Sequence, residues 1–154
     1  MTVTRAARCP ADAVLDVLAD GWSYSSWVVG AARIRAVDAV WPEPGARILH
    51  SVGLWPVLLD DETVVRAWVP GRSIDLQARG WPAGEARVLI EVEPAPGGAG
   101  CAIRVTEDAD KGPGVLVPRP VRSALIGPRN VESLRRLVFL AERRAPGQRP
   151  HDPR

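Results

Sequence analysis

The stretch RVLIEVEPAPGGAGCAIRVTE, residues 87–107, carries the pattern that decides the fold. In its first part Val88, Ile90 and Val92 share one face while Arg87, Glu91 and Glu93 share the other, and the alternation returns over residues 101–107. A period of two is typical of a β-strand with one buried face. The Pro- and Gly-rich residues between the two parts are turn formers. The stretch therefore predicts an antiparallel hairpin whose apolar face needs a cover.

The chain before this hairpin repeats the same pattern of short apolar segments and turns. The further strands predicted are residues 33–40, 47–53, 62–69 and 73–81. The turn signals after them are Pro42-Glu43-Pro44-Gly45, Trp55-Pro56 with Asp60-Asp61, Pro70-Gly71 and Pro82-Ala83-Gly84. Connections this short favour antiparallel neighbours, because parallel strands need crossovers of about a dozen residues.

Helices are predicted on both sides of this meander. A first strand over residues 2–8 is followed by two short helices, over 10–20 and 23–29. From Pro118 onward, apolar residues recur at helical spacing as far as Ala141, and this long helix is the expected cover of the sheet. Gly127-Pro128 interrupts the pattern, so we expect a kink or two abutting helices there. The predicted fold class is α+β.

Length and composition limit the classes of protein that the chain can belong to. A chain of 154 residues suits one domain, predicted over 1–145, with residues 146–154 as a disordered tail. No stretch approaches the roughly 20 apolar residues needed to span a bilayer. No apolar run follows the first residues, so we expect no signal peptide, no stable membrane insertion and a cytoplasmic location. The two cysteines, Cys9 and Cys101, are then expected to be reduced.

The net charge of +2 is mild, and basic residues are mostly interspersed with acids. A cluster at Arg135, Arg136, Arg143 and Arg144 has two interpretations. In the first interpretation, the cluster binds nucleic acid or an anionic surface. In the second, it complements the dipole at the end of the last helix. We favour the second interpretation and expect no nucleic-acid partner.

Two residues are candidates for acid-base chemistry. His50 lies between Ile48 and Val52 at a period of two, so its ring is expected to point inward with them. The alternative is a core histidine bonded to a neighbour. Glu107 has the inward parity of its strand and is a candidate proton acceptor. The alternative roles of this carboxylate are an ion pair with an arginine such as Arg79, or a cap for the loop that follows.

Tryptophan is unusually common, with six in a chain that has one Phe and one Tyr. Indoles around a pocket suit a planar or isoprenoid ligand, but they also serve as core corners and turn anchors. Trp27 and Trp55 are the first choices for a pocket, and Trp68, Trp81 and Arg79 complete the predicted ligand-binding set.

Four motifs resemble the polyketide cyclase/dehydrase and lipid-transport branch of the START-like (SRPBCC) superfamily. They are His50-Ser51-Val52-Gly53, Arg79-Gly80-Trp81-Pro82, Glu107 with Gly112-Pro113-Gly114, and Arg129-Asn130-Val131-Glu132-Ser133-Leu134 with Arg136-Leu137. The resemblance covers residues 2–144, and Pro128 departs from it. It implies the helix-grip fold, in which about seven antiparallel strands wrap around the C-terminal helix. It also implies a cavity for a hydrophobic ligand between sheet and helix.

Three functions are compatible with these residues. The first is binding of a hydrophobic small molecule, such as a lipid or polyketide. The second is a polyketide cyclase or aromatase with His50 and Glu107 as acid-base groups. The third is a protein-interaction module with a filled core. No phosphate loop, metal cluster or nucleophile elbow is present in the sequence, so we expect no metal and no cofactor. The sequence fits a monomer and a homodimer equally.

Overall fold

The computed structural model describes residues 1–54, 56–80 and 84–145. The N-terminal elements are β1 (Thr2–Ala7), α1 (Ala11–Ala19), the short 3-10 helix η1 (Gly21–Ser23) and α2 (Tyr24–Trp27). The strands that follow are β2 (Ala31–Val37), β3 (Arg47–Leu54), β4 (Val57–Val69), β5 (Ser73–Gly80), β6 (Gly84–Pro94) and β7 (Cys101–Lys111). A second 3-10 helix, η2 (Pro113–Leu116), leads into α3 (Arg119–Arg144).

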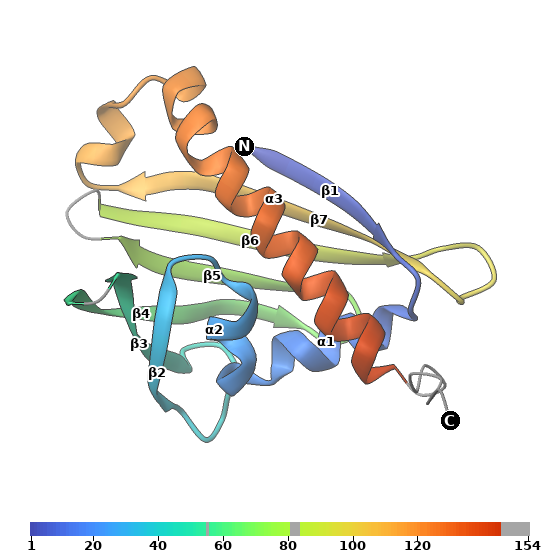
Figure 1. Cartoon of the computed structure of the whole chain (residues 1–154). Helices are drawn as coiled ribbons and strands as arrows, with labels where there is room; N and C mark the ends of the chain where they lie inside the picture. Colours follow the sequence, from blue (N-terminus) through green and yellow to red (C-terminus); the bar gives the residue numbers. More distant parts are fainter. Residues whose placement is uncertain (55, 81–83, 146–154) are drawn as a thin grey trace, which may run out of the picture.

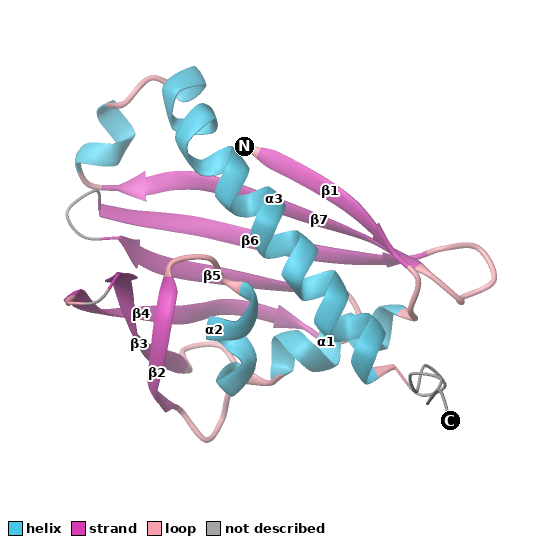
Figure 2. Cartoon of the chain, in the orientation of Figure 1, coloured by secondary structure: helices cyan, strands magenta, loops and turns pink. Residues whose placement is uncertain are grey.

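All strands join one antiparallel sheet of seven strands in the order β1-β7-β6-β5-β4-β3-β2. Figure 1 shows the sheet bending around α3, which lies diagonally across its concave face, with α1 and α2 beside the helix. Figure 2 shows the same two layers, helices on one side and strands on the other. Register shifts between β2 and β3 and between β4 and β5 accompany the bend, since bulges increase local twist. The predicted fold class and architecture are confirmed.

The alternation found in the sequence fixes which side chains form the core. Ile90 and Val92 of β6 are buried in the core cluster that also includes residues of α1 and α3, whereas Glu91 between them has the outward parity. The same holds for Ile103 and Val105 of β7. From the helix, Leu134, Leu137 and Ala141 complete this core. One face of the sheet is therefore exposed to solvent and the other is covered by α3, as predicted.

The turn predicted at Asp60-Asp61 is wrong, because both residues lie inside β4, which starts at Val57. Asp61 pairs across the sheet with His50 and is buried on the inner face. Aspartate is a common turn former, so a buried aspartate within a strand is misread from sequence. The β3–β4 hairpin is therefore longer than the sequence predicted.

The C-terminal segment forms one helix from Arg119 to Arg144, not two abutting ones. Pro128 lies inside it and removes one helical N–H donor. Gly127 is buried beside Met1, and a Cβ on it would lie 2.7 Å from the Met1 methyl carbon. The Met1 side chain thus packs against the helix at this glycine and would have to shift to admit a larger residue.

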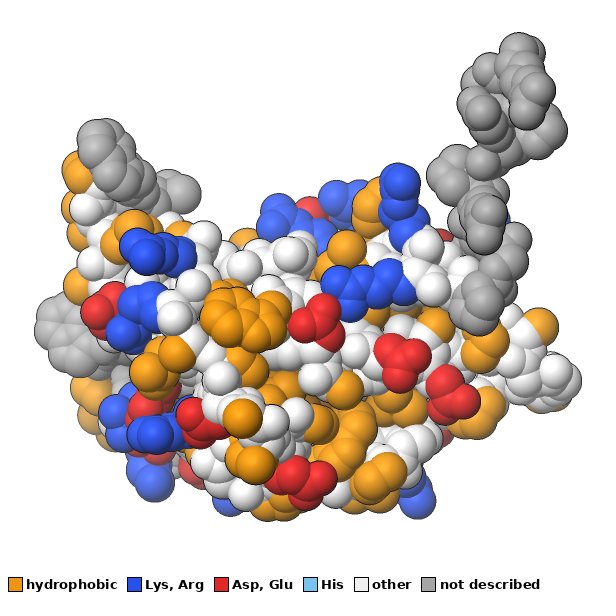
Figure 3. All heavy atoms as spheres, turned by 90° about the horizontal axis from the view of Figure 1, so that it is seen from below, with side chains coloured by type: hydrophobic (Ala, Val, Ile, Leu, Met, Phe, Trp, Pro, Cys, Tyr) orange, Lys and Arg blue, Asp and Glu red, His pale blue; other side chains and the backbone are white. Residues whose placement is uncertain are grey.

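The arginine cluster near the end of α3 is engaged within the molecule. Arg135 and Arg136 both bond Glu132, at 2.7 and 2.8 Å. Arg144 bonds Asp20 at 2.9 Å, and the last of the four, Arg143, lies over the ring of Phe139. The face seen in Figure 3 mixes basic, acidic and apolar side chains. The tail predicted over 146–154 lies outside the described residues.

Candidate functional site

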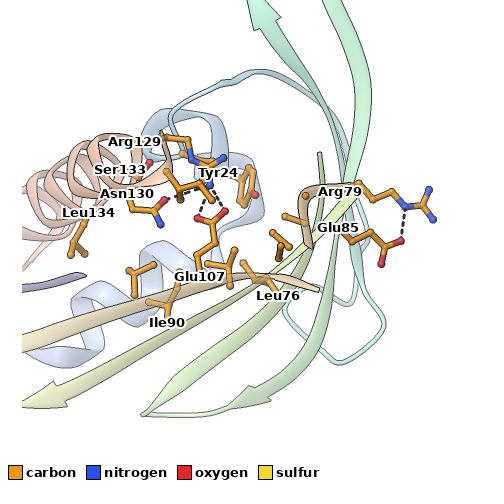
Figure 4. Close-up of a pocket in the computed structure, with 18 of the residues that line it drawn as sticks. Tyr24, Leu76, Arg79, Glu85, Ile90, Glu107, Arg129, Asn130, Ser133 and Leu134 are labelled. Carbon is orange, nitrogen blue, oxygen red and sulfur yellow. Dashed lines mark hydrogen bonds and ion pairs between the residues drawn. The ribbon is translucent and has the colours of Figure 1, made fainter. Parts of the chain in front are cut away.

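A cavity of about 320 Å³ lies between the sheet and α3. Residues of α2, β5, β6, β7, η2 and α3 line it (Figure 4). Its volume is within the range of small-molecule sites, which is about 300–1,000 Å³. Most of its wall is aliphatic or aromatic, including Trp27, Leu76, Ile90, Val105 and Leu134. The cavity is therefore of a size and polarity that suit an apolar molecule.

Small residues explain why the space between sheet and helix is hollow here. Ala78, Ala86 and Ala109 line the cavity from three neighbouring strands, and Ala86 pairs directly with Ala109. Gly114 of η2 adds no side chain. Elsewhere under α3 the corresponding positions carry branched side chains that fill the gap, such as Ile103. Protein cores are otherwise closely packed, so four small residues at one end leave room for a ligand.

Glu107 and Arg129 form an ion pair at the cavity wall (Figure 4). The Arg129 guanidinium donates through Nη2 to both carboxylate oxygens, 2.6 Å from Oε2. The Glu107 side chain is only 5% exposed and that of Arg129 is 44% exposed. Hydrogen bonds between the backbones of Met1 and Glu107 fix the position of Glu107 in the sheet. A buried carboxylate thus meets a cation that also reaches solvent.

One turn of α3 presents two further polar residues to the cavity. Asn130 is 5% exposed, and its Oδ1 lies 3.5 Å from Nη2 of Arg129. Its amide nitrogen, Nδ2, has no hydrogen-bond partner among the described residues. Ser133 lines the cavity one turn later and accepts a bond from the backbone N–H of Val29 at 3.0 Å. Three polar residues of the cavity wall, Arg129, Asn130 and Ser133, therefore come from this one part of α3.

A chain of hydrogen bonds runs from the cavity to His50. The Tyr24 ring lines the cavity, and its hydroxyl lies 3.0 Å from the Thr63 hydroxyl. The same Thr63 oxygen lies 3.1 Å from His50 Nε2. Both His50 Nδ1 and Asp61 Oδ2 are buried without a partner in the described residues. His50 and Asp61 are cross-strand partners, so a small polar cluster lies beneath Tyr24.

Burial controls the protonation of this cluster. It lowers the pKa of His50 from its ordinary value of 6.5, an effect that Asp61 partly opposes and Arg35 reinforces. Burial also raises the pKa of Tyr24 from its ordinary value of 10.0, an effect that the hydrogen bond between Tyr24 and Thr63 partly offsets. A neutral imidazole and a neutral phenol are therefore the resting forms near pH 7.

The structure brings three of the predicted site residues to the cavity. Trp27 and Glu107 line it, and Arg79 lies at its edge, directed away and paired with Glu62 and Glu85. The partner of Glu107 is thus Arg129 and not Arg79. Of the other predicted residues, His50 lies behind Tyr24 and Trp68 packs elsewhere on the core, and neither lines the cavity. Trp55 and Trp81 lie outside the described residues.

Sequence reasoning did not select Tyr24, Arg129, Asn130 or Ser133 as site residues. The last three belong to the motif quoted for the family resemblance, and Ser133 follows Asn130 by three residues and Arg129 by four, a spacing typical of one helix face. Tyr24 is the single tyrosine of the chain and lies in the short segment rich in aromatic residues. These features of the sequence could have identified the four residues as site candidates.

No group of three or more His, Cys, Asp or Glu side chains that could hold a metal ion is found in the described ranges. Of the helices that the structure describes, none is both long and apolar enough to span a membrane.

Comparison with known proteins places the chain in a family. Residues 1–142 match the family described as "Polyketide cyclase / dehydrase and lipid transport". No curated protein matches the chain by sequence.

Solved structures share the fold at low identity. The Zhui aromatase/cyclase from Streptomyces sp. R1128 is 17% identical, with a TM-score of 0.66 over 94% of this chain and 93% of that one. A START superfamily protein from Mycobacterium smegmatis is 17% identical, with a TM-score of 0.62 over 92% and 93%. Protein CV1439 from Chromobacterium violaceum is 16% identical, with a TM-score of 0.65 over 92% and 96%. The helix-grip fold is shared with these neighbours, and the chain belongs to the polyketide cyclase/dehydrase and lipid-transport family.

Proposed function

We propose that the protein binds a hydrophobic small molecule, such as a lipid or polyketide, in the cavity under α3. The observation that carries this proposal is the hollow itself, about 320 Å³ with a mostly apolar wall. An empty apolar cavity costs stability, because its lining loses packing contacts. An apolar ligand would restore those contacts and leave water. The hollow also favours this function over a protein-interaction module with a filled core.

Filling the cavity tests the proposal. Ala86→Phe places a ring into the hollow from β6, so binding of the neutral apolar probe N-phenyl-1-naphthylamine should weaken at least tenfold. Ala102→Phe is the matched control, because Ala102 is also half-buried but has the outward parity of β7. A fluorescence titration of both variants and the wild type measures the effect. Equal affinity in all three proteins would place the probe outside the cavity and overturn the proposal.

A second candidate function is a polyketide cyclase-type enzyme that uses the same cavity. The observation that favours it is the chain from Tyr24 through Thr63 to His50, which offers a route for a proton between the cavity wall and a neutral imidazole. Cyclisation of a poly-β-ketone needs a proton removed from a methylene and another delivered to a carbonyl oxygen. His50→Ala should then change the rate or products from a synthetic poly-β-ketone thioester without unfolding the protein. A variant that is less stable but still folded, with unchanged ligand affinity and turnover, supports a core role for His50.

The cellular setting belongs to the same proposal. We place the protein in the cytoplasm, where its two buried thiols, Cys9 and Cys101, would stay reduced. Its ligand is then a metabolite of the cell interior.

A further inference from the structure

The amide of Asn130 is a buried donor that points at the cavity and lacks an acceptor. Asn130 is 5% exposed and lines the cavity, and its Nδ2 has no partner among the described residues. Figure 4 shows its side chain extending from α3 toward the sheet, beside the Glu107 carboxylate. Buried polar groups in proteins are nearly always hydrogen-bonded, so an unpaired one in a cavity wall calls for a partner from outside the chain.

The neighbouring arginine determines which way the amide faces. Asn130 Oδ1 lies 3.5 Å from Arg129 Nη2. A guanidinium has only donors, so it attracts the amide oxygen and repels the amide nitrogen. The opposite orientation would set two donors against each other. Arg129 therefore directs Nδ2, and not Oδ1, into the cavity.

The charges around this donor select against an anionic ligand. The cation nearest to it, Arg129, is already neutralised by Glu107. Arg79, at the cavity edge, is paired with Glu62 and Glu85. An ionised carboxylate bound at Asn130 would lie beside the Glu107 carboxylate, without an unpaired cation among the described residues of the cavity wall. Burying such a charge is unfavourable.

We infer that the ligand is a neutral, mostly apolar molecule with an acceptor oxygen, such as a ketone or ester carbonyl, which accepts a hydrogen bond from Asn130 Nδ2. This inference rests on the proposed function and narrows its ligand class. The apolar wall binds the bulk of the molecule, while one amide fixes where its oxygen lies. A site that hydrogen-bonds a ligand oxygen discriminates against analogues that lack it, because the donor is otherwise left unpaired.

Three probes of nearly equal shape separate the contributions. 2-Acetylnaphthalene presents a carbonyl, 2-isopropenylnaphthalene replaces that oxygen by a methylene, and 2-naphthoate presents an anion. Calorimetric titration of the wild-type protein should show the ketone binding about tenfold tighter than the alkene. The anion should bind more weakly than both.

Substitution at Asn130 identifies the group responsible. Asn130→Leu keeps the approximate volume and removes the donor, so the ratio of ketone to alkene affinity should fall to about one while the alkene still binds. Arg136→Leu, on the exposed side of the same helix, is the matched control and should keep the tenfold ratio. Asn130→Ala is a second variant should the leucine variant not fold, and circular dichroism checks each protein.

The outcomes distinguish this inference from the proposed function. If the alkene and the ketone bind equally to the wild type, or if Asn130→Leu keeps the preference, Asn130 does not recognise the oxygen and the inference fails alone. Tighter binding of 2-naphthoate than of the ketone also overturns it. If none of the three probes binds, the cavity takes no apolar molecule, and the proposed function fails together with the inference.

Discussion

Removing the positive charge of Arg129 should destabilise the protein through Glu107. In Arg129→Met the carboxylate stays buried, at 5% exposure, without its cation. Breaking a fully buried ion pair in this way costs about 3–5 kcal/mol. The Arg129 side chain is 44% exposed and therefore partly screened by water, which lowers the expected cost to about 2–3 kcal/mol. For a chain of this size the midpoint of thermal unfolding would fall by about 4–12 °C.

Urea unfolding of four proteins measures this energy as a double-mutant cycle. The proteins are the wild type, Arg129→Met, Glu107→Gln and the double variant. The double variant should recover at least half of the unfolding free energy that Arg129→Met loses, because it has no buried charge without a partner. A loss below about 0.5 kcal/mol, or a fully additive cycle, would refute the role given to this ion pair.

Two further predictions follow from burial. Because burial lowers the pKa of His50 from 6.5, the unfolded chain takes up this proton first, and the free energy of unfolding should fall as pH drops from 7 to 5. In His50→Gln the free energy of unfolding should lose this pH dependence, which is worth up to about 1.4 kcal/mol per pH unit. Urea titrations of both proteins at each pH measure it. Parallel profiles of unfolding free energy against pH would contradict the prediction. Burial, and the neighbouring Cys101, raise the pKa of Cys9 to about 11, which leaves roughly one thiolate in a thousand at pH 8. A disulfide reagent should therefore label the native protein far more slowly than the protein in urea, and labelling at equal rates would disprove the burial of both thiols.

The sheet and its cover were predictable because they depend on local periodicity. Alternation over β6 and β7 specifies which face is buried, whatever the details of packing. The turn at Asp60-Asp61 was wrongly predicted because the burial of Asp61 depends on its neighbours across the sheet, which local periodicity does not reveal. The continuous α3 was likewise not foreseen, because Gly127-Pro128 indicates an interruption locally although Pro128 lies inside the helix.

The cavity depends on the meeting of residues far apart in the sequence. Ala86 and Ala109 become a hollow only once they pair across β6 and β7 beneath a helix. Neither residue differs in sequence from alanines that are simply packed. The partner of Glu107 was missed for the same reason, since Arg129 comes from the helix and not from a neighbouring strand.

Tryptophan content was a weak guide to the site. Trp27 lines the cavity, whereas Trp22 is 61% exposed. Trp41 acts as a turn anchor by donating from its indole nitrogen to the carbonyl of Leu18 at 3.1 Å. An indole is equally useful in a core, a turn and a pocket, so its position in the fold decides its role.

The central claim is that the cavity under α3 holds an apolar ligand, and native mass spectrometry tests it most directly. Wild-type protein and Ala86→Phe, both purified from the protein's own host, should be compared under identical conditions. We predict a population of wild-type protein carrying a small neutral molecule, and loss of that population in Ala86→Phe, whose cavity is filled. Wild-type protein without any bound molecule, or an equal adduct on both proteins, would contradict it.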